Sequence, residues 1–170
     1  MQIRRSYFDE ERCFDIITQH VKDVVPSVIA NSVFDPEYRN SSSVFLYGDE
    51  LKEDFKNITN KEYKNYELGI QFTEYNAGQF YKWHDDHNRV QSHSLVLNDD
   101  FEGGDFVIRN DEEGWKKTFK LGTGDVISFD SSLLHKVAKV TKGVRYALVC
   151  WVLDGKKNLS KNFLEQTTMV

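Results

Sequence analysis

The feature that most constrains the fold is a series of short alternating segments that begins near residue 66. In the first segment every second residue is apolar, at Leu68, Ile70 and Phe72. The opposite phase is polar, at Gln71, Thr73 and Tyr75. Since successive side chains of an extended chain point to opposite faces, this pattern predicts a β-strand with one apolar and one polar face.

Six further strand-like runs follow, at residues 92–98, 105–109, 116–121, 125–129, 135–140 and 144–153. Turn-forming stretches separate these runs, and at Gly103-Gly104 we expect a tight turn or a close backbone approach. Strands this short and this regularly spaced favour a sandwich or a jelly roll. We therefore expect a mainly β fold.

A helix is predicted before the strands. Apolar residues recur at steps of three and four, at Phe14, Ile17, Val21 and Val24. The spacing indicates an amphipathic helix, with Asp9 as its N-cap and Pro26 as its stop. His20 falls off the apolar face, so we expect it on the surface.

A second, shorter helix is predicted by apolar residues that follow Asp49, at Leu51, Phe55 and Ile58. Residues 35–43, between the two helices, are polar and turn-rich, and we interpret them as a loop that covers the site. With helices in front of the strands, the fold class is α+β.

The chain has 170 residues and is most simply one domain. In this interpretation residues 1–65 are a helical support and lid region, residues 66–153 are the β core, and residues 154–170 are a C-terminal tail. The sequence contains no internal repeat and no convincing domain boundary.

Composition narrows the function classes. The chain has 22 Lys and Arg against 27 Asp and Glu, a net charge of -5, so it lacks the broad basic footprint of a nucleic-acid binder. Cys13 and Cys150 lie far apart without a CxxC spacing, which argues against a disulfide framework or a thiolate metal site and favours two buried thiols. The first residues lack the apolar region of a signal peptide, and no stretch approaches the roughly 20 apolar residues of a membrane span. We expect a soluble, cytoplasmic protein.

The candidate chemistry begins at His84-Asp85-Asp86. Residues 84 and 86 share one side of an extended chain, whereas Asp85 points away. Together with His135 from another strand, they can occupy one face of an octahedral iron and leave its other positions open. Arg145 can hold an acidic cosubstrate beside that metal, because a guanidinium grips a carboxylate through two hydrogen bonds.

Each of these residues also has an ordinary explanation. An isolated His-x-Asp tripeptide is weak evidence, since it arises by chance and is more often a surface hydrogen bond, and Arg145 alone can be an exposed strand residue. His87 lies an odd number of residues from both His84 and Asp86 and would point to the opposite face. We interpret His87 and His93 as loop or exposed histidines.

Four ordered blocks give these residues a context. They are Tyr75-Asn-Ala-Gly78 followed after five residues by His84-x-Asp86, then Leu97-Asn98 with Gly103-Gly104-Asp105, then Gly124-Asp125 with Phe129, and finally His135 with Val137, Val140, Gly143, Arg145 and Trp151. This order resembles the 2-oxoglutarate and Fe(II)-dependent oxygenase family, and more closely its prolyl 4-hydroxylase branch. The resemblance covers roughly residues 66–153.

The resemblance implies a fold and a set of roles. The family fold is a double-stranded β-helix, a cupin-like jelly roll, with its metal near the mouth of the barrel. The positions of the Fe(II) ligands match His84, Asp86 and His135, and Arg145 matches the residue that pairs with the far carboxylate of 2-oxoglutarate. Tyr75 matches a tyrosine that helps to hold this cosubstrate, although it can also be a tyrosine at the edge of the core.

The implied activity is that of a dioxygenase that hydroxylates its substrate and releases succinate and CO2. Its catalytic residues would be His84, Asp86, His135 and Arg145. The resemblance implies Fe(II), 2-oxoglutarate and O2, with ascorbate as a candidate reductant.

Further pocket residues are less certain from sequence. Trp151 shares a strand face with Arg145 and either lines the same cavity or belongs to the core. Some prolyl hydroxylases use a tyrosine hydroxyl where this chain has Val96. Ser92 and Ser94 share that face and can replace the hydroxyl, or they are ordinary strand serines. Val137 completes the set of pocket candidates.

Three functions are compatible with these observations. The first is a prolyl 4-hydroxylase-like enzyme that acts on a peptide or protein. The second is an oxygenase of the same superfamily that acts on nucleic acid or on a small molecule. The nucleic-acid demethylating branch usually carries a second arginine where this chain has Trp151, so nucleic acid is disfavoured. The third is a cupin-like metal-binding module without turnover, which would not need Arg145. We expect a peptide or protein partner, a small molecule as the alternative, and no membrane partner.

Overall fold

A computed structural model describes residues 1–29 and 32–155, and all structural statements concern these residues. The helices are α1 (Glu10–His20) and α2 (Asp49–Asn57), with short 3-10 helices η1 (Val21–Asp23) and η3 (Lys61–Tyr63). The strands are β1 (Gln2–Arg4), β2 (Val25–Pro26), β3 (Arg39–Asn40), β4 (Ser42–Leu46), β5 (Leu68–Asn76), β6 (Phe80–His84), β7 (Arg89–Val96), β8 (Glu102–Gly103), β9 (Phe106–Asn110), β10 (Trp115–Phe119), β11 (Val126–Asp130), β12 (Leu134–Val137), β13 (Val140–Lys142) and β14 (Val144–Leu153).

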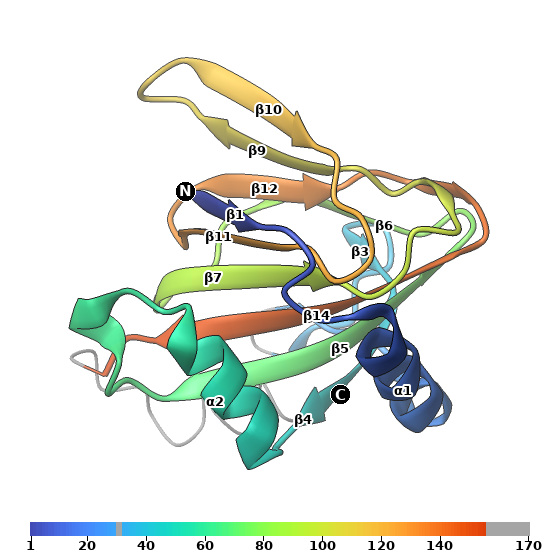
Figure 1. The fold of residues 1–170 in the computed structure, drawn as a ribbon. Coiled ribbons are helices and arrows are strands. Elements are labelled where there is room, and N and C mark those ends of the chain that lie inside the picture. The colour runs from blue at the N-terminus through green and yellow to red at the C-terminus, as the bar shows by residue number, and fades with distance from the viewer. Residues whose placement is uncertain (30–31, 156–170) are drawn as a thin grey trace.

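Two antiparallel sheets face each other. In the described part of the chain, the larger sheet has the strand order β1-β11-β7-β14-β5-β4-β2, and the smaller has the order β10-β9-β12-β6-β3. Figure 1 shows the smaller sheet above the larger one, with α1 and α2 below. Two facing antiparallel sheets with helices on one outer side confirm the predicted mainly β jelly roll with N-terminal helices.

The predicted strands are present with small shifts of their ends. The run at 144–153 is one strand, β14, whereas the run at 135–140 is divided between β12 and β13. Gly103 and Gly104 both have positive φ, and a Cβ on Gly103 would lie 2.4 Å from the carbonyl oxygen of Lys139. This confirms the close backbone approach expected there, because only glycine fits that space at that φ.

The loop predicted at residues 35–43 is wrong for its second half. Arg39–Asn40 forms β3, which pairs with β6, and β4 begins at Ser42 and pairs with β5. These polar residues are strands because their backbone groups extend the edges of both sheets. The polarity that indicated a loop places polar side chains inside the molecule instead, since Arg39, Ser41 and Ser43 are all buried.

The first helix is confirmed, but its buried face overlaps only partly with the predicted one. The Asp9 carboxylate accepts a hydrogen bond from the Arg12 backbone N–H at 2.8 Å, which confirms the N-cap. Cys13 and Ile16 are the buried residues of α1, whereas Phe14 is 67% exposed. Ile17 and Val24 of the predicted face still pack against the core, so the buried stripe overlaps the predicted one and is rotated by less than about 100° around the helix.

Two smaller differences concern the end of this region and its histidine. The helix α1 ends at His20, and the chain then forms η1 before it reaches Pro26. His20 is half-buried instead of lying on the surface, because its ring is 5.9 Å from that of Phe72.

No helix among the described residues is long and apolar enough to cross a membrane. The predicted C-terminal tail lies outside the described residues from residue 156 onward.

The larger sheet has an apolar outer face and a polar inner face. The outer face packs against both helices in one core cluster that includes Cys13, Phe55, Ile70, Phe72, Leu148 and Cys150. Burial raises the pKa of Cys13 to about 11 and raises that of Cys150 still further, so both residues remain protonated thiols. A second cluster lies on the inner side and includes Tyr75, Ile108, Ile127 and Phe129.

Asp125 fastens the N-terminal segment to the β core. Its carboxylate accepts hydrogen bonds from the backbone N–H of Ser6 at 2.8 Å, the backbone N–H of Gly122 at 2.8 Å and the Arg5 guanidinium at 2.7 Å. Burial raises the pKa of Asp125, but these donors outweigh burial and leave that pKa below its usual value. The ionised carboxylate therefore stabilises the folded state.

We expect the substitution Asp125→Asn to lower the free energy of unfolding by about 2 kcal/mol, because hydrogen bonds to charged groups are lost. The folded-state pKa is depressed, so this contribution is complete above the unfolded value of about 3.9 and is lost as pH falls through the lower folded pKa. Urea unfolding at a series of pH values measures the difference. Asp111→Asn, at an exposed carboxylate, is the control and should change stability by less than about 0.5 kcal/mol. An equal loss in both variants would contradict the role of Asp125.

Candidate metal and cosubstrate site

The inner face of the larger sheet forms one wall of a cavity between the two sheets. In the register of β5 and β14, Arg145 lies opposite Tyr75, and Val149 lies opposite Gln71. Ser94 of β7 lies on the other side of Val149. These side chains face the smaller sheet and line a space of about 460 Å³, its open mouth included. The polar phase of the predicted strand is thus the cavity wall.

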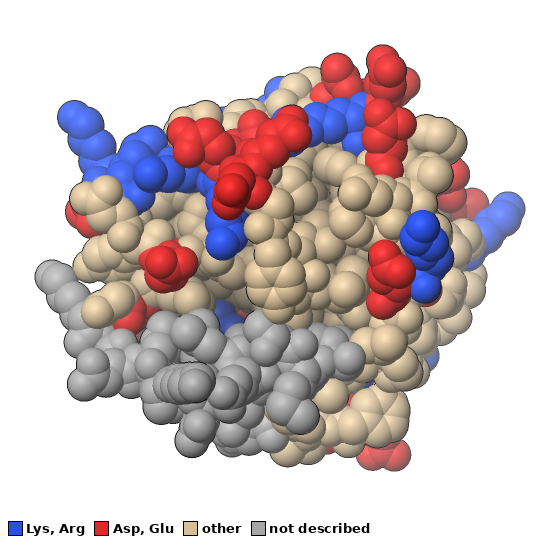
Figure 2. Space-filling model, turned by 90° about the horizontal axis from the view of Figure 1, so that it is seen from below, with Lys and Arg blue, Asp and Glu red and all other residues tan. Residues whose placement is uncertain are grey.

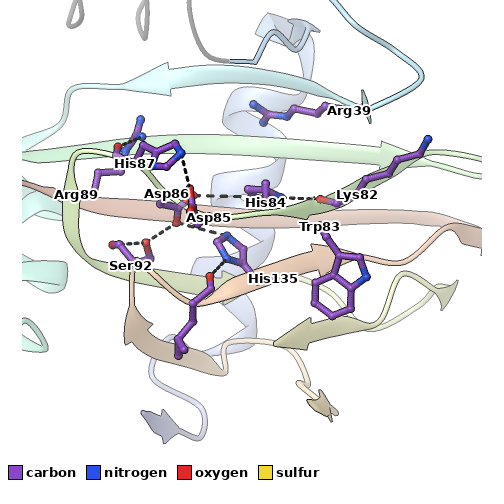
Figure 3. A network of polar contacts seen from close by, with 12 residues as sticks. Arg39, Lys82, Trp83, His84, Asp85, Asp86, His87, Arg89, Ser92 and His135 are labelled. Carbon is purple, nitrogen blue, oxygen red and sulfur yellow. Dashed lines mark hydrogen bonds and ion pairs between the residues drawn. The ribbon is translucent and has the colours of Figure 1, made fainter. Parts of the chain in front are cut away.

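Three predicted ligand residues meet at this cavity. His84 ends β6, Asp86 follows two residues later, and His135 of β12 lies directly opposite His84 in the sheet register. The Asp86 carboxylate is 3.4 Å from His135 Nε2 and 4.0 Å from His84 Nε2. One ligand atom from each residue lies within 4.8 Å of the other two, and Figure 3 shows Asp86 in contact with both histidines. Within the described residues this group alone is suited to hold a metal ion.

Backbone carbonyls orient both histidine rings. His84 Nδ1 lies 2.7 Å from the Lys82 carbonyl oxygen, and His135 Nδ1 lies 2.9 Å from the Leu133 carbonyl oxygen. A carbonyl only accepts hydrogen bonds, so each Nδ1 carries a proton and donates it. The coordinating atom of each ring is therefore Nε2, the atom directed toward Asp86.

The Asp86 carboxylate is held from behind. Ser92 Oγ donates a hydrogen bond of 2.5 Å to Asp86 Oδ2 and is itself 2.9 Å from Ser131 Oγ. The backbone N–H of Asp86 donates to the Ser131 carbonyl oxygen at 2.9 Å. Ser92, predicted as a pocket residue, thus lies behind Asp86 and orients it. This arrangement leaves the other carboxylate oxygen, Oδ1, turned toward His84.

The charges of the three residues are strongly coupled. Burial, reinforced by the proximity of His135, lowers the pKa of His84 to about 3. Burial also lowers the pKa of His135, but attraction to Asp86 and the hydrogen bond between them outweigh burial and raise it. For Asp86, burial raises the pKa, and the neighbouring His135 outweighs this effect and lowers it. A bound cation would replace the proton that this pair shares.

A β-bulge brings Tyr81 next to the metal-binding group. His135 pairs with His84, but Val137 pairs with Tyr81, so β6 has one residue more than β12 between these two pairs. The extra residue turns Tyr81 and His84 to the same face, and their rings stack with centroids 3.6 Å apart. Period-two reasoning missed Tyr81 because two residues separate it from His84. Gln71 and Thr73, which also line the cavity, carried the signal of a polar strand phase.

Arg145 is a second feature of the cavity. It is 2% exposed, and its guanidinium carbon lies 5.7 Å from the centre of the Tyr75 ring. Burial lowers the pKa of Arg145 and outweighs the nearby Tyr75 and Asp105, which raise it. Among the described residues no carboxylate forms an ion pair with Arg145. A buried guanidinium that has no direct ion pair in the described part of the chain is suited to an anionic ligand.

The remaining predicted residues separate into two groups. The cavity is lined by three of the four predicted pocket residues, Ser94, Val137 and Trp151. His87 is exposed and pairs with Asp85 at 3.2 Å, as expected for a residue outside the metal-binding group. His93, however, is fully buried in β7, so its interpretation as a loop or exposed histidine is wrong.

Hydrogen bonds explain the burial of His93. Its Nε2 lies 3.1 Å from Thr59 Oγ1, and its Nδ1 lies 2.7 Å from Ser128 Oγ. Burial lowers the pKa of His93 to about 3, so the ring is neutral. It is a satisfied core histidine, and both of its partners are too distant in sequence to predict.

Comparison with known proteins adds the family. The sequence profile of the 2OG-Fe(II) oxygenase superfamily matches residues 70–153, which include the metal-binding group and Arg145. The chain belongs to this superfamily. Membership in the 2OG-Fe(II) oxygenases implies Fe(II) and 2-oxoglutarate. The donor set fits that metal, because two imidazole nitrogens and one carboxylate leave positions open for other ligands.

Two relatives illustrate the sequence match. A PKHD-type hydroxylase of Psychrobacter sp. (strain PRwf-1) is 40% identical over 96 residues, which cover 48% of this chain and 36% of that protein. A PKHD-type hydroxylase of Idiomarina loihiensis is 34% identical over 91 residues, which cover 49% of this chain and 41% of that protein. The chain therefore spans less than half of the length of these two relatives.

Solved structures confirm the fold of this 2OG-Fe(II) oxygenase. A prolyl-4-hydroxylase of Pseudomonas putida matches with a TM-score of 0.76 at 15% identity, over 89% of this chain and 91% of that chain. A prolyl hydroxylase of Trichoplax adhaerens, in complex with a hypoxia inducible factor peptide fragment, matches with a TM-score of 0.75 at 18% identity, over 91% of this chain and 84% of that chain. The predicted double-stranded β-helix is confirmed.

We expect Ser92→Ala to weaken Fe(II) binding by about tenfold or more, because Asp86 loses the donor that orients it. Anaerobic titration of the metal-free protein with Fe(II) measures the affinity. Ser94→Ala is the matched control, since Ser94 lies two residues further along the same strand face and does not contact Asp86. If both variants bind Fe(II) like the wild type, Ser92 does not support the metal-binding group.

Proposed function

We propose that this protein is an Fe(II)- and 2-oxoglutarate-dependent dioxygenase that hydroxylates its substrate and releases succinate and CO2. One observation carries the proposal. Two histidine Nε2 atoms and one carboxylate converge on a cavity that also contains Arg145, a buried cation that has no ion pair with any described residue. A metal-binding module without turnover has no use for such a cation.

Each residue has a role in the proposal. His84, Asp86 and His135 hold the iron, and the Arg145 guanidinium grips the far carboxylate of 2-oxoglutarate. When bound, the metal and the cosubstrate supply the oxidising chemistry. Tyr75, 3% exposed and opposite Arg145 in the sheet register, confines the cosubstrate at that end of the cavity. Val96 leaves this wall without a further tyrosine hydroxyl, and Ser94 is the nearest hydroxyl on the same strand face.

We further propose a peptide or protein substrate with a prolyl residue. Support comes from the hydroxylase names of the sequence relatives and from the two prolyl hydroxylase structures, one of which contains a peptide. Nucleic acid is a weaker candidate. Figure 2 shows acidic groups beside basic ones on the face in view, where a nucleic-acid binder would gather basic groups. O2 is the other cosubstrate, and ascorbate is the candidate reductant.

The proposal predicts that the wild type with Fe(II), 2-oxoglutarate and O2 adds one oxygen to a proline-containing peptide. Mass spectrometry of a peptide panel, with succinate measured in the same samples, is the test. Asp86→Ala should abolish both signals, because the metal loses its only charged ligand. Succinate without oxidation of any peptide would sink the prolyl assignment and keep the dioxygenase. Intact Fe(II) binding without succinate would leave a metal-binding module.

A separate prediction concerns the cosubstrate anchor. Arg145→Gln should weaken 2-oxoglutarate binding by about tenfold or more, because a charge-assisted bidentate contact is lost. Arg145→Lys should lose less, since it keeps the charge and not the planar fork. Calorimetric titration under argon measures the affinity. Unchanged affinity in Arg145→Gln would show that the carboxylate binds elsewhere.

A further inference from the structure

A second buried arginine lines the same cavity. Arg39 of β3 is 7% exposed, and it borders the space that also contains His84, Asp86 and Arg145. Its position in a two-residue strand fixes it firmly, because Arg39 pairs with Tyr81 in the sheet register. Arg39 lies outside the four sequence blocks that resemble the oxygenase family, and it has no role in the proposed function.

All protein partners of the Arg39 guanidinium are neutral. Its Nη2 donates to Gln71 Oε1 at 2.9 Å, its Nη1 to the Val28 carbonyl oxygen at 3.0 Å, and its Nε to Ser41 Oγ at 3.2 Å. A guanidinium has five N–H donors, so these three bonds leave two donors for another acceptor. Within the described residues no carboxylate forms an ion pair with Arg39.

A closed polar network fixes the orientation of this cation. Gln71 Nε2 donates to Ser43 Oγ at 3.1 Å, and Ser43 Oγ is 2.7 Å from Ser27 Oγ. Ser41 Oγ lies 2.9 Å from the same Ser27 oxygen, which returns the network to Arg39. Such satisfied networks are rigid. A cation that is buried and rigid, yet has no counter-charge, is costly unless a ligand supplies one.

The guanidinium lies close to the metal-binding group. Its carbon is 4.8 Å from the centre of the Tyr81 ring, and that ring stacks on His84. Figure 3 draws Arg39 on the side of His84 that faces away from His135. Arg39 therefore contacts the ring that stacks on a metal-binding histidine, and it borders the same cavity.

The sheet register separates Arg39 from the cosubstrate anchor. Arg39 bonds to Gln71, and Arg145 lies opposite Tyr75, four residues further along β5. Four residues of a strand separate the Gln71 and Tyr75 Cα atoms by about 13 Å, so the two guanidinium groups are supported at different places along β5. We propose that Arg39 is a specificity residue that binds a carboxylate of the hydroxylated substrate.

This inference rests on the proposed function and narrows its substrate class. A carboxylate beside the reacting carbon has two sources, the α-carboxylate of a free or C-terminal amino acid and the side chain of an acidic residue next to the target in a peptide. Both present the same planar anion to the two remaining N–H donors. The substrate class is therefore an amino acid or peptide with an acidic group close to the oxidised position.

Paired probes that differ only in the carboxylate test the inference. The protein with Fe(II) is kept under argon, with and without 2-oxoglutarate, and titrated calorimetrically with glycyl-L-proline and glycyl-L-prolinamide. A second pair consists of capped peptides in which aspartate or asparagine follows proline. In at least one pair the wild type should bind the acid about tenfold more tightly than the amide, and the pair that responds identifies the source.

Arg39→Gln should abolish this preference and leave 2-oxoglutarate affinity unchanged. Arg109→Gln removes an equal charge from an arginine over the Trp83 ring, outside the cavity lining, and should keep the preference. Arg39→Lys retains the charge and should keep part of it, which provides a folded variant if the glutamine disrupts the network. No preference in the wild type, its survival in Arg39→Gln, or a loss of 2-oxoglutarate affinity in that variant would overturn the inference. Failure of the wild type to bind 2-oxoglutarate would instead refute the proposed function.

Discussion

The two faces of β5, β7 and β14 are the constraint on which the rest of the structure depends. Apolar residues such as Phe72, Leu95 and Leu148 turn outward and are buried against α1 and α2, so only part of the inner face is needed for the second core cluster. The inner face can then carry Gln71, Ser94 and other polar residues that line a cavity. A sheet whose apolar side faced inward would fill the same space with side chains. The helices thus make the site possible by covering the other side.

The smaller sheet supplies the precision of the metal-binding group. Register places His84 beside His135, and carbonyls at Lys82 and Leu133 select the same tautomer in both rings. The bulge in β6 then stacks Tyr81 on His84, which restricts the rotation of the imidazole. Donors built on strands hold a geometry more exactly than donors on loops. Only Asp86 lies beyond a strand end, and Ser92 and Ser131 compensate for that freedom.

Sequence periodicity predicted whatever depended on local alternation. The strands, the inward phase of Gln71, Thr73 and Tyr75, and the approach of His84 to Asp86 all follow from a period of two. Features that need a partner distant in the chain were missed. The sequence predicted an exposed His93, because the hydrogen bonds of its ring nitrogens with Thr59 and Ser128 could not be foreseen. The position of Tyr81 in the cavity depends on one extra residue in β6. The polar residues 35–43 predict a loop, and only the pairing of β3 with β6 and of β4 with β5 makes part of this segment strand.

Arg39 and Arg145 show how the fold relates stability to ligand chemistry. Each is a buried cation without an ion pair among the described residues, and each therefore makes the cavity electrostatically unfavourable without a ligand. The two differ in support, since neutral hydrogen bonds fix the Arg39 guanidinium whereas Arg145 lies along the Tyr75 ring. A cavity with one cation favours one anionic ligand. Here Arg39 of β3 and Arg145 of β14 lie next to different residues of β5, so the cavity favours two anionic groups. The arrangement is thus suited to two ligands that each bring a carboxylate, as the proposed cosubstrate and substrate would.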